Sequence, residues 1–260
     1  MRGLSWKIGR VAGIDLFLHP SFLLLPAWGL MVGGTDYVVM IVAVFACVVL
    51  HELGHALTAR SFGISTHDIT LYPIGGVARL ERMPKAPGAE LLIALAGPLV
   101  NVALAGGFAL ILSLSNGLGS LGGFSYLREF TAELLMINLL LAAFNMVPAF
   151  PMDGGRVLRA ALTGPLGRFR ATEIAVSIGR AIAILFGVYA LLTFSPMQVV
   201  LAGFVYFASG AELAQVRYEE HRRRFGSSEE GVWTAPRGYH WVDRGNGFWQ
   251  LAPIHVNSRV

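Results

Sequence analysis

Six apolar segments alternate with shorter polar connections along this sequence. They cover about residues 14–32, 37–60, 89–115, 126–147, 172–194 and 197–216. Each approaches the roughly 20 apolar residues that a helix needs to cross the hydrocarbon core of a bilayer. The pattern therefore predicts an all-α polytopic membrane protein with six transmembrane helices.

One connection has a different pattern. From His67 to Glu81, apolar and polar residues partly alternate and glycine and proline interrupt the run, which indicates short strands and not a helix. We expect a membrane-associated β-hairpin or small sheet after the second helix. Its edge is suited to pair with an extended peptide, and an ordinary connecting hairpin is an equally good interpretation of the same residues.

The chain becomes polar after the sixth apolar segment. Residues 218–260 carry Trp233, Trp241 and Trp249 among polar and charged side chains. We therefore expect residues 1–217 to form the membrane core and residues 218–260 to form a cytoplasmic tail of undefined role. The tail suits either a small soluble module or a segment that lies on the membrane interface through its aromatic rings.

Composition supports the membrane interpretation. Hydrophobic residues make up 55% of the chain and charged residues 14%, with a mean hydropathy of +0.60, whereas about a quarter of the residues in soluble domains are charged. The net charge of +4 does not indicate nucleic acid binding, because the basic residues cluster beside the apolar segments. The single cysteine, Cys47, excludes a disulfide framework within the chain.

The basic clusters predict the orientation of the chain. They lie at the N-terminus, between the second and third segments, between the fourth and fifth, and after the sixth. Lys and Arg are enriched on the cytoplasmic side of membrane proteins. Both termini are therefore expected in the cytoplasm, with the protein in the cell (plasma or inner) membrane.

The second apolar segment contains His51-Glu52-Leu53-Gly54-His55. In a helix, His51 and His55 lie one turn apart on the same face, so that both imidazoles can bind one metal ion. Glu52 lies beside them and can handle a proton, which is the arrangement of zinc hydrolases. A chance match on an ordinary helix is the alternative. Ionisable groups in an apolar helix are costly, at about 2.5–3.5 kcal/mol for a charged residue near its centre, and this favours a functional role.

A third ligand is expected near the end of the fourth segment. Residues 145–156 contain two prolines and a glycine pair, which break a helix and leave irregular backbone near membrane depth. Such backbone is tolerated where it is buried in protein or lines a wet cavity. Asp153 in this stretch is the obvious third ligand, and a simple turn role before the glycine pair is the competing interpretation. Cys47 lies one turn before His51 and could offer a sulfur ligand, but a packing role is favoured because an apolar cysteine usually serves as a small packing residue.

Two further polar residues interrupt apolar segments. His19 either approaches the metal site or caps a kinked helix end, and the structural role is favoured because Pro20 restricts it. Asn101 lies about one turn from Pro98, where it can bond the backbone groups that the proline frees. His19 and Asn101 are both candidate accessory residues of the site.

Together these motifs resemble the site-2 protease family of intramembrane zinc metalloproteases. The resemblance rests on His51 to His55, on residues 145–156, on Ala96-Gly97-Pro98 with Asn101, and on Ile74-Gly75-Gly76-Val77. It implies that His51, His55 and Asp153 bind one catalytic zinc ion and that Glu52 is the general acid and base. It also implies that Asn145 contacts the substrate backbone or the oxyanion, and that the strand region with Gly75 and Gly76 clamps an unwound substrate.

The resemblance further implies a substrate class. Family members cut single-span membrane proteins, often membrane-tethered regulators or anti-sigma factors that an upstream site-1-type protease has already trimmed. The short interval from Ser61 to Gly88 leaves no room for a PDZ domain, and the tail is too short for paired CBS modules, so a compact bacterial or archaeal type is expected. A membrane metal-ion carrier using the same ligands is the alternative function, and a catalytically inactive scaffold fits the full ligand set less well.

Overall fold

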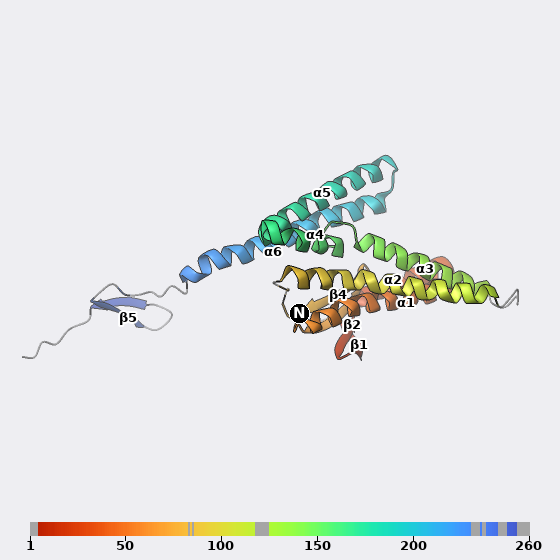
Figure 1. The fold of residues 1–260 in the computed structure, drawn as a ribbon, viewed down its shortest axis with the longest axis horizontal. Helices are drawn as coiled ribbons and strands as arrows, with labels where there is room; N and C mark the ends of the chain where they lie inside the picture. The colour runs from red at the N-terminus through yellow and green to blue at the C-terminus, as the bar shows by residue number, and fades with distance from the viewer. Residues whose placement is uncertain are drawn as a thin grey trace, which may run out of the picture. The chain divides into compact units, whose positions relative to one another are not determined.

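The computed structural model describes residues 5–82, 84, 86–117, 125–229, 235, 238–243 and 249–253. The chain forms two compact units, Met1–Leu213 and Ala214–Val260 (Figure 1). In the second unit, β5 (Tyr239–Asp243) pairs antiparallel with β6 (Trp249–Pro253). Trp233 and other parts of the predicted tail lie outside the described residues.

The first long helix, α1 (Leu24–Ser61), bends sharply at Gly34. The backbone there has a φ of 69°, a left-handed conformation that glycine adopts because it lacks a Cβ. The two arms fold back on each other, since the ring of Phe22 lies 4.6 Å from that of Phe45 and the Ile41 side chain lies against Gly29. The predicted break between the first two apolar segments is therefore confirmed.

The prediction of a first transmembrane helix from residue 14 is wrong over its first part. Residues before Pro20 form β1 (Trp6–Val11) and β2 (Ile14–Leu18), and Pro20–Leu23 form a 3-10 turn. The helical arm from 24 to 33 is about 15 Å long at the usual rise per residue, half of the roughly 30 Å hydrocarbon thickness. The local sequence predicted a helix here because it does not show that β2 is stabilised by pairing with β3 (Thr66–Tyr72), some fifty positions later in the chain.

The predicted strands after the second apolar segment are confirmed as β3 (Thr66–Tyr72) and β4 (Gly75–Leu80). They belong to a larger sheet with the order β1-β2-β3-β4. β1 and β2 are antiparallel, β2 and β3 parallel, and β3 and β4 antiparallel. β4 is thus an edge strand, with one side paired to β3 and the other free within this sheet.

The remaining helices are α2 (Pro87–Gly117), α3 (Ser125–Asn145), α4 (Asp153–Leu166), α5 (Arg168–Leu192) and α6 (Pro196–Glu229). Within the described part of the chain, four helical stretches are long and apolar enough to cross a membrane: Pro20–Ser61, Pro87–Ser115, Arg168–Leu192 and Pro196–His221. The count of six spans is therefore not confirmed. The short helix α4 was not predicted, because its arginines and glycines indicate a polar connection.

Helix α2 is the centre of the packing around the site. It contacts α1, α3 and α4 (Figure 1). On the other side of α1, Leu53 and Ala56 pack against the sheet in a buried cluster with Ile69. This contact fixes the rotation of α1. At 100° per residue, His51 and His55 must then lie on the face opposite the sheet.

Candidate metal centre

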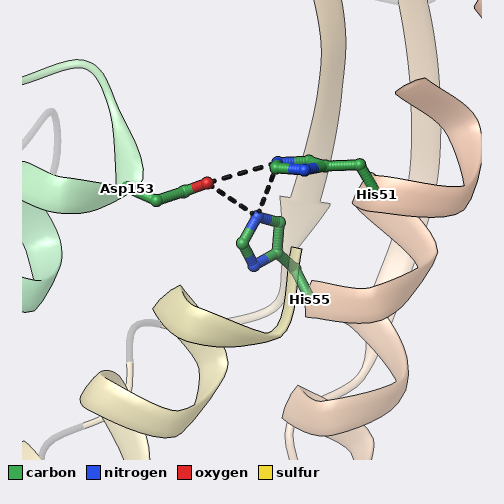
Figure 2. Close-up of side chains that lie close together, drawn as sticks. All are labelled: His51, His55 and Asp153. Atoms are coloured by element: carbon green, nitrogen blue, oxygen red, sulfur yellow. Dashed lines mark hydrogen bonds and ion pairs between the residues drawn. The ribbon is translucent and has the colours of Figure 1, made fainter. Parts of the chain in front are cut away.

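Figure 2 shows three side chains that converge between α1 and α4. The Nε2 atoms of His51 and His55 are 3.1 Å apart. The Oδ2 atom of Asp153 lies 3.2 Å from the first and 3.1 Å from the second. All three residues are buried, and among the described residues they are the group of His, Cys, Asp or Glu able to hold one metal ion. The structure thus brings together residues 98 positions apart.

The other ring nitrogen of His55 is occupied. His55 Nδ1 lies 2.6 Å from the backbone oxygen of Ile93 on α2. A carbonyl oxygen only accepts hydrogen bonds, so Nδ1 must carry the proton and Nε2 must present a lone pair when the ring is neutral.

A longer chain of hydrogen bonds sets the state of His51. The Leu134 carbonyl accepts from Asn138 Nδ2 at 2.8 Å, so Asn138 Oδ1 is free to accept from Asn101 Nδ2, also at 2.8 Å. Asn101 Oδ1 must then accept from His51 Nδ1. This relay of hydrogen bonds begins at the Leu134 carbonyl, which can only accept. It therefore places the proton of the neutral His51 ring on Nδ1 and leaves the Nε2 lone pair facing Asp153.

Three acceptor atoms therefore meet with no proton between them when both rings are neutral. Such atoms repel each other unless a cation lies among them. Two imidazole nitrogens, one carboxylate oxygen and hydrogen bonds on the distal ring nitrogens are the ligand set and support of catalytic zinc sites.

Two glycines bring backbone close to the site. A Cβ on Gly97 would lie 2.2 Å from His55 Nε2 and 2.7 Å from His51 Cε1, so only glycine allows α2 to pass this close to both rings. A Cβ on Gly76 would lie 2.8 Å from Glu52 Cγ. Strand β4 therefore runs directly beside the Glu52 side chain, which is partly buried next to the cluster.

The other predicted site residues have mixed outcomes. His19 caps the 3-10 turn, accepts from the Ser21 backbone N–H at 3.3 Å and stacks on Tyr72, which is the structural role favoured from sequence. Asn101 accepts from His51 Nδ1 and donates to Asn138 Oδ1, so its amide bonds side chains beside the cluster and not the backbone near Pro98. Asn145 is the last residue of α3 and is partly exposed. Within the described residues, no hydrogen bond or ion pair joins it to the cluster.

Sequence reasoning missed Asn138, whereas the packing role that it favoured for Cys47 agrees with the structure. Asn138 is fully buried and supports Asn101 from α3. Cys47 accepts a weak hydrogen bond from Asn138 Nδ2 at 3.4 Å and is not among the three converging side chains. The one feature of the sequence that pointed to Asn138 was its place as a polar residue within an apolar segment. Its hydrogen bond to Asn101, 37 residues earlier, cannot be deduced from the sequence.

Comparison with known proteins assigns the class. Peptidase family M50 matches residues 39–135 and 123–186. These ranges together cover more than half of the chain, so the chain belongs to this family. With its apolar helices, it is a multi-pass membrane protein.

Individual relatives agree with the family. A zinc metalloprotease of Methanocaldococcus jannaschii is 37% identical over 219 residues, covering 83% of this chain and 62% of that protein. Stage IV sporulation protein FB of Bacillus subtilis is 27% identical over 213 residues, covering 81% of this chain and 67% of that protein. The chain thus spans less than two thirds of the length of the archaeal relative.

A solved structure also matches. The site-2 protease from Methanocaldococcus jannaschii has a TM-score of 0.59 and 34% sequence identity, and the match covers 80% of this chain and 95% of that structure. The likeness therefore covers most of this chain. In this chain, Leu80 and Pro87 are separated by a short connection with no inserted domain.

Proposed function

We propose that this protein is a zinc-dependent endopeptidase that hydrolyses a peptide bond within or near the transmembrane segment of a single-span membrane protein. The observation that carries the proposal is the convergence of His51 Nε2, His55 Nε2 and Asp153 Oδ2 within 3.2 Å. The hydrogen bonds of both Nδ1 atoms leave these three atoms as acceptors. Family membership and the zinc metalloproteases among the relatives support the same function.

His51, His55 and Asp153 would hold the metal. Two nitrogens and one oxygen leave a fourth position of a tetrahedral zinc site for water or substrate. When bound, zinc supplies Lewis acidity that makes a water molecule more acidic and polarises a peptide carbonyl.

Glu52 is the residue placed to move protons. It neighbours His51 on α1 and its side chain reaches toward Gly76 on β4. We assign it the role of general base that takes a proton from the attacking water on a carboxylate oxygen. The same carboxyl then gives that proton to the leaving amine nitrogen.

Strand β4 offers a place for the substrate. A peptide bond in a transmembrane helix is shielded by its own hydrogen bonds, so the substrate must unwind before it is cut. The free edge of β4 at Gly75 and Gly76 can pair with an extended segment, and Gly76 places that segment beside Glu52. This favours a binding role for the strand pair over that of a plain connection.

Asn145 remains the proposed contact for the substrate backbone or the oxyanion. It ends α3, eight residues before Asp153 along the connection to α4. The residue is partly exposed, and we assign its amide to contact a bound peptide. Replacing Asn145 with alanine should therefore lower cleavage without lowering zinc affinity.

The cellular setting is proposed from the charge pattern and the family. Basic clusters beside the apolar segments favour cytoplasmic termini in the cell membrane. A membrane-tethered regulator or anti-sigma factor, first trimmed by a site-1-type protease, is the proposed substrate. Residues 218–260 are proposed to be a separate cytoplasmic tail.

The test compares the purified full-length protein with its Glu52→Gln variant in detergent. Bound zinc is measured by elemental analysis, and cleavage is followed on a tagged single-span membrane protein. We expect both forms to bind one zinc ion and only the wild type to cut, in a chelator-sensitive way. Zinc transport into liposomes without cleavage of a broad panel of membrane proteins would overturn the protease proposal and favour a carrier.

A further inference from the structure

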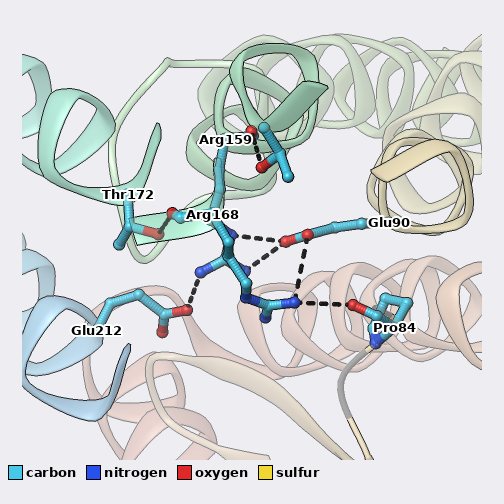
Figure 3. A network of polar contacts seen from close by, with 7 residues as sticks. Pro84, Glu90, Arg159, Arg168, Thr172 and Glu212 are labelled. Atoms are coloured by element: carbon cyan, nitrogen blue, oxygen red, sulfur yellow. Dashed lines mark hydrogen bonds and ion pairs between the residues drawn. The ribbon is translucent and has the colours of Figure 1, made fainter. Parts of the chain in front are cut away.

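Arg159 lies in the interior of the protein, away from the three converging side chains. Its exposed fraction is 0%. Figure 3 shows that its guanidinium group joins three helices: Arg159 belongs to α4, Glu90 to α2 and Glu212 to α6. The Nε atom donates to Glu90 Oε1 at 2.7 Å, and Nη1 donates to Glu212 Oε1.

The stability of the helix bundle does not by itself explain this network. Removing charges from water costs several kcal/mol per ion, and apolar residues of similar volume often replace a buried ion network without loss of stability. The guanidinium geometry does, however, fix the directions of two carboxylates at once. A network of this kind is suited to setting how helices are placed against each other.

Glu90 lies on the face of α2 that supports the histidines. Counting along the helix, Glu90, Ile93, Gly97 and Asn101 follow steps of three, four and four residues, so they share one face. Three of these four residues contact the histidine rings directly. The ion pair therefore attaches α4 to the same surface that positions His51 and His55.

The other side of Arg159 holds the connection that leads to Asp153. The guanidinium carbon lies 5.0 Å from the ring centre of Phe150. The Phe150 carbonyl accepts from Ser209 Oγ on α6 at 2.7 Å. Both Phe150 and Ser209 are buried, so the residues just before Asp153 are fixed by ring and backbone contacts together.

We propose that Arg159 is a positioning residue for the metal site. By attaching α4 to α2 through Glu90 and packing on Phe150, it sets Asp153 Oδ2 at the distance from both histidines that one ion requires. The Glu212 contact anchors α6 to the same group. This inference rests on the proposed function, because it requires His51, His55 and Asp153 to be metal ligands.

The test measures zinc affinity of the full-length protein in detergent by competition with a chromogenic chelator. Arg159→Met removes the guanidinium and leaves the buried carboxylate of Glu90 and the partly buried carboxylate of Glu212 without it, so a triple variant, E90L/R159M/E212L, removes the charges together. Arg170→Gln is the matched control, since Arg170 is an exposed arginine on α5. Unfolding of the metal-free forms is followed in parallel by circular dichroism.

We expect zinc affinity to fall by about tenfold or more in Arg159→Met and in the triple variant, as for other residues that orient metal ligands. Arg159→Lys should recover part of the affinity, because lysine keeps the charge but not the forked geometry. With Co²⁺ as probe, the visible spectrum of the triple variant should lose the intensity of a tetrahedral site. Arg170→Gln should match the wild type in all of these measurements.

Two outcomes contradict different parts of the argument. If the triple variant binds zinc as tightly as the wild type, Arg159 serves only to stabilise the bundle and the inference is wrong. If the wild type itself binds no zinc while remaining folded, the proposed metal site is wrong, and the inference about Arg159 is overturned with it.

Discussion

His51 Nδ1 on α1 donates a hydrogen bond to Asn101 Oδ1 on α2, and both side chains are buried. The direction of this bond follows from the carbonyl of Leu134, which starts the relay through Asn138 and Asn101. Two asparagines from different helices thus decide which nitrogen of His51 faces Asp153. The metal site depends on α2 and α3 as well as on the helices that carry the proposed ligands.

Asn101→Leu should weaken zinc binding by roughly 10- to 100-fold, the usual effect of losing a residue that orients a metal ligand. Leucine offers no acceptor to His51 Nδ1, so the ring loses its fixed tautomer and orientation. Asn101→Asp keeps an oxygen toward His51 and should bind zinc more tightly than Asn101→Leu. Competition titration with a chelator measures both, and equal affinities would show that this hydrogen bond does not orient His51.

Gly97→Ala should abolish zinc binding and cleavage. A Cβ there would lie 2.2 Å from His55 Nε2, so the rings or the helix must move. Gly106→Ala is the control on the same helix, because a Cβ at Gly106 meets nothing within 4 Å. This control should bind zinc normally and be slightly more stable, by up to about 1 kcal/mol from helix propensity. Normal zinc content in Gly97→Ala would contradict the close packing of α2 on the histidines.

Gly76→Ala should lower kcat for cleavage while zinc content stays at the wild-type level. The new methyl group would lie 2.8 Å from Glu52 Cγ, so it displaces the proposed base without touching the proposed ligands. Gly9→Ala, in strand β1, is a suitable control since nothing lies within 4 Å of its Cβ position. Loss of zinc in Gly76→Ala would show that the strand supports the metal site and not the base.

Zinc should raise the unfolding temperature of the protein, because the ion would join α1 to α4. A ligand at 100 times its Kd stabilises the folded state by about 2.7 kcal/mol. Thermal unfolding with excess zinc and with chelator measures this difference. Asp153→Ala should remove most of the shift. A shift of full size in that variant would exclude Asp153 as a ligand.

Local patterns in the sequence were sufficient to predict those parts of the fold and site that lie within one helix or one pair of neighbouring strands. The spacing of His51 and His55 places both on one helical face, and alternation from His67 to Glu81 predicted β3 and β4 correctly. They failed at Ile14–Leu18, where a strand was taken for the start of a helix. That strand depends on parallel pairing with β3, and no short window of sequence contains both partners.

The amino-acid sequence by itself indicated the class of protein, the His51–His55 motif on α1 and Asp153 as the candidate third ligand, because spacing, apolar runs and helix breakers are local properties. Only the tertiary structure decided that Asn138 orients Asn101, that Gly97 packs on both imidazoles, and that Arg159 joins α4 to α2. These relationships depend on the rotation and separation of packed helices. Such quantities arise from contacts between residues distant in the chain, so the sequence pattern of any one helix does not contain them.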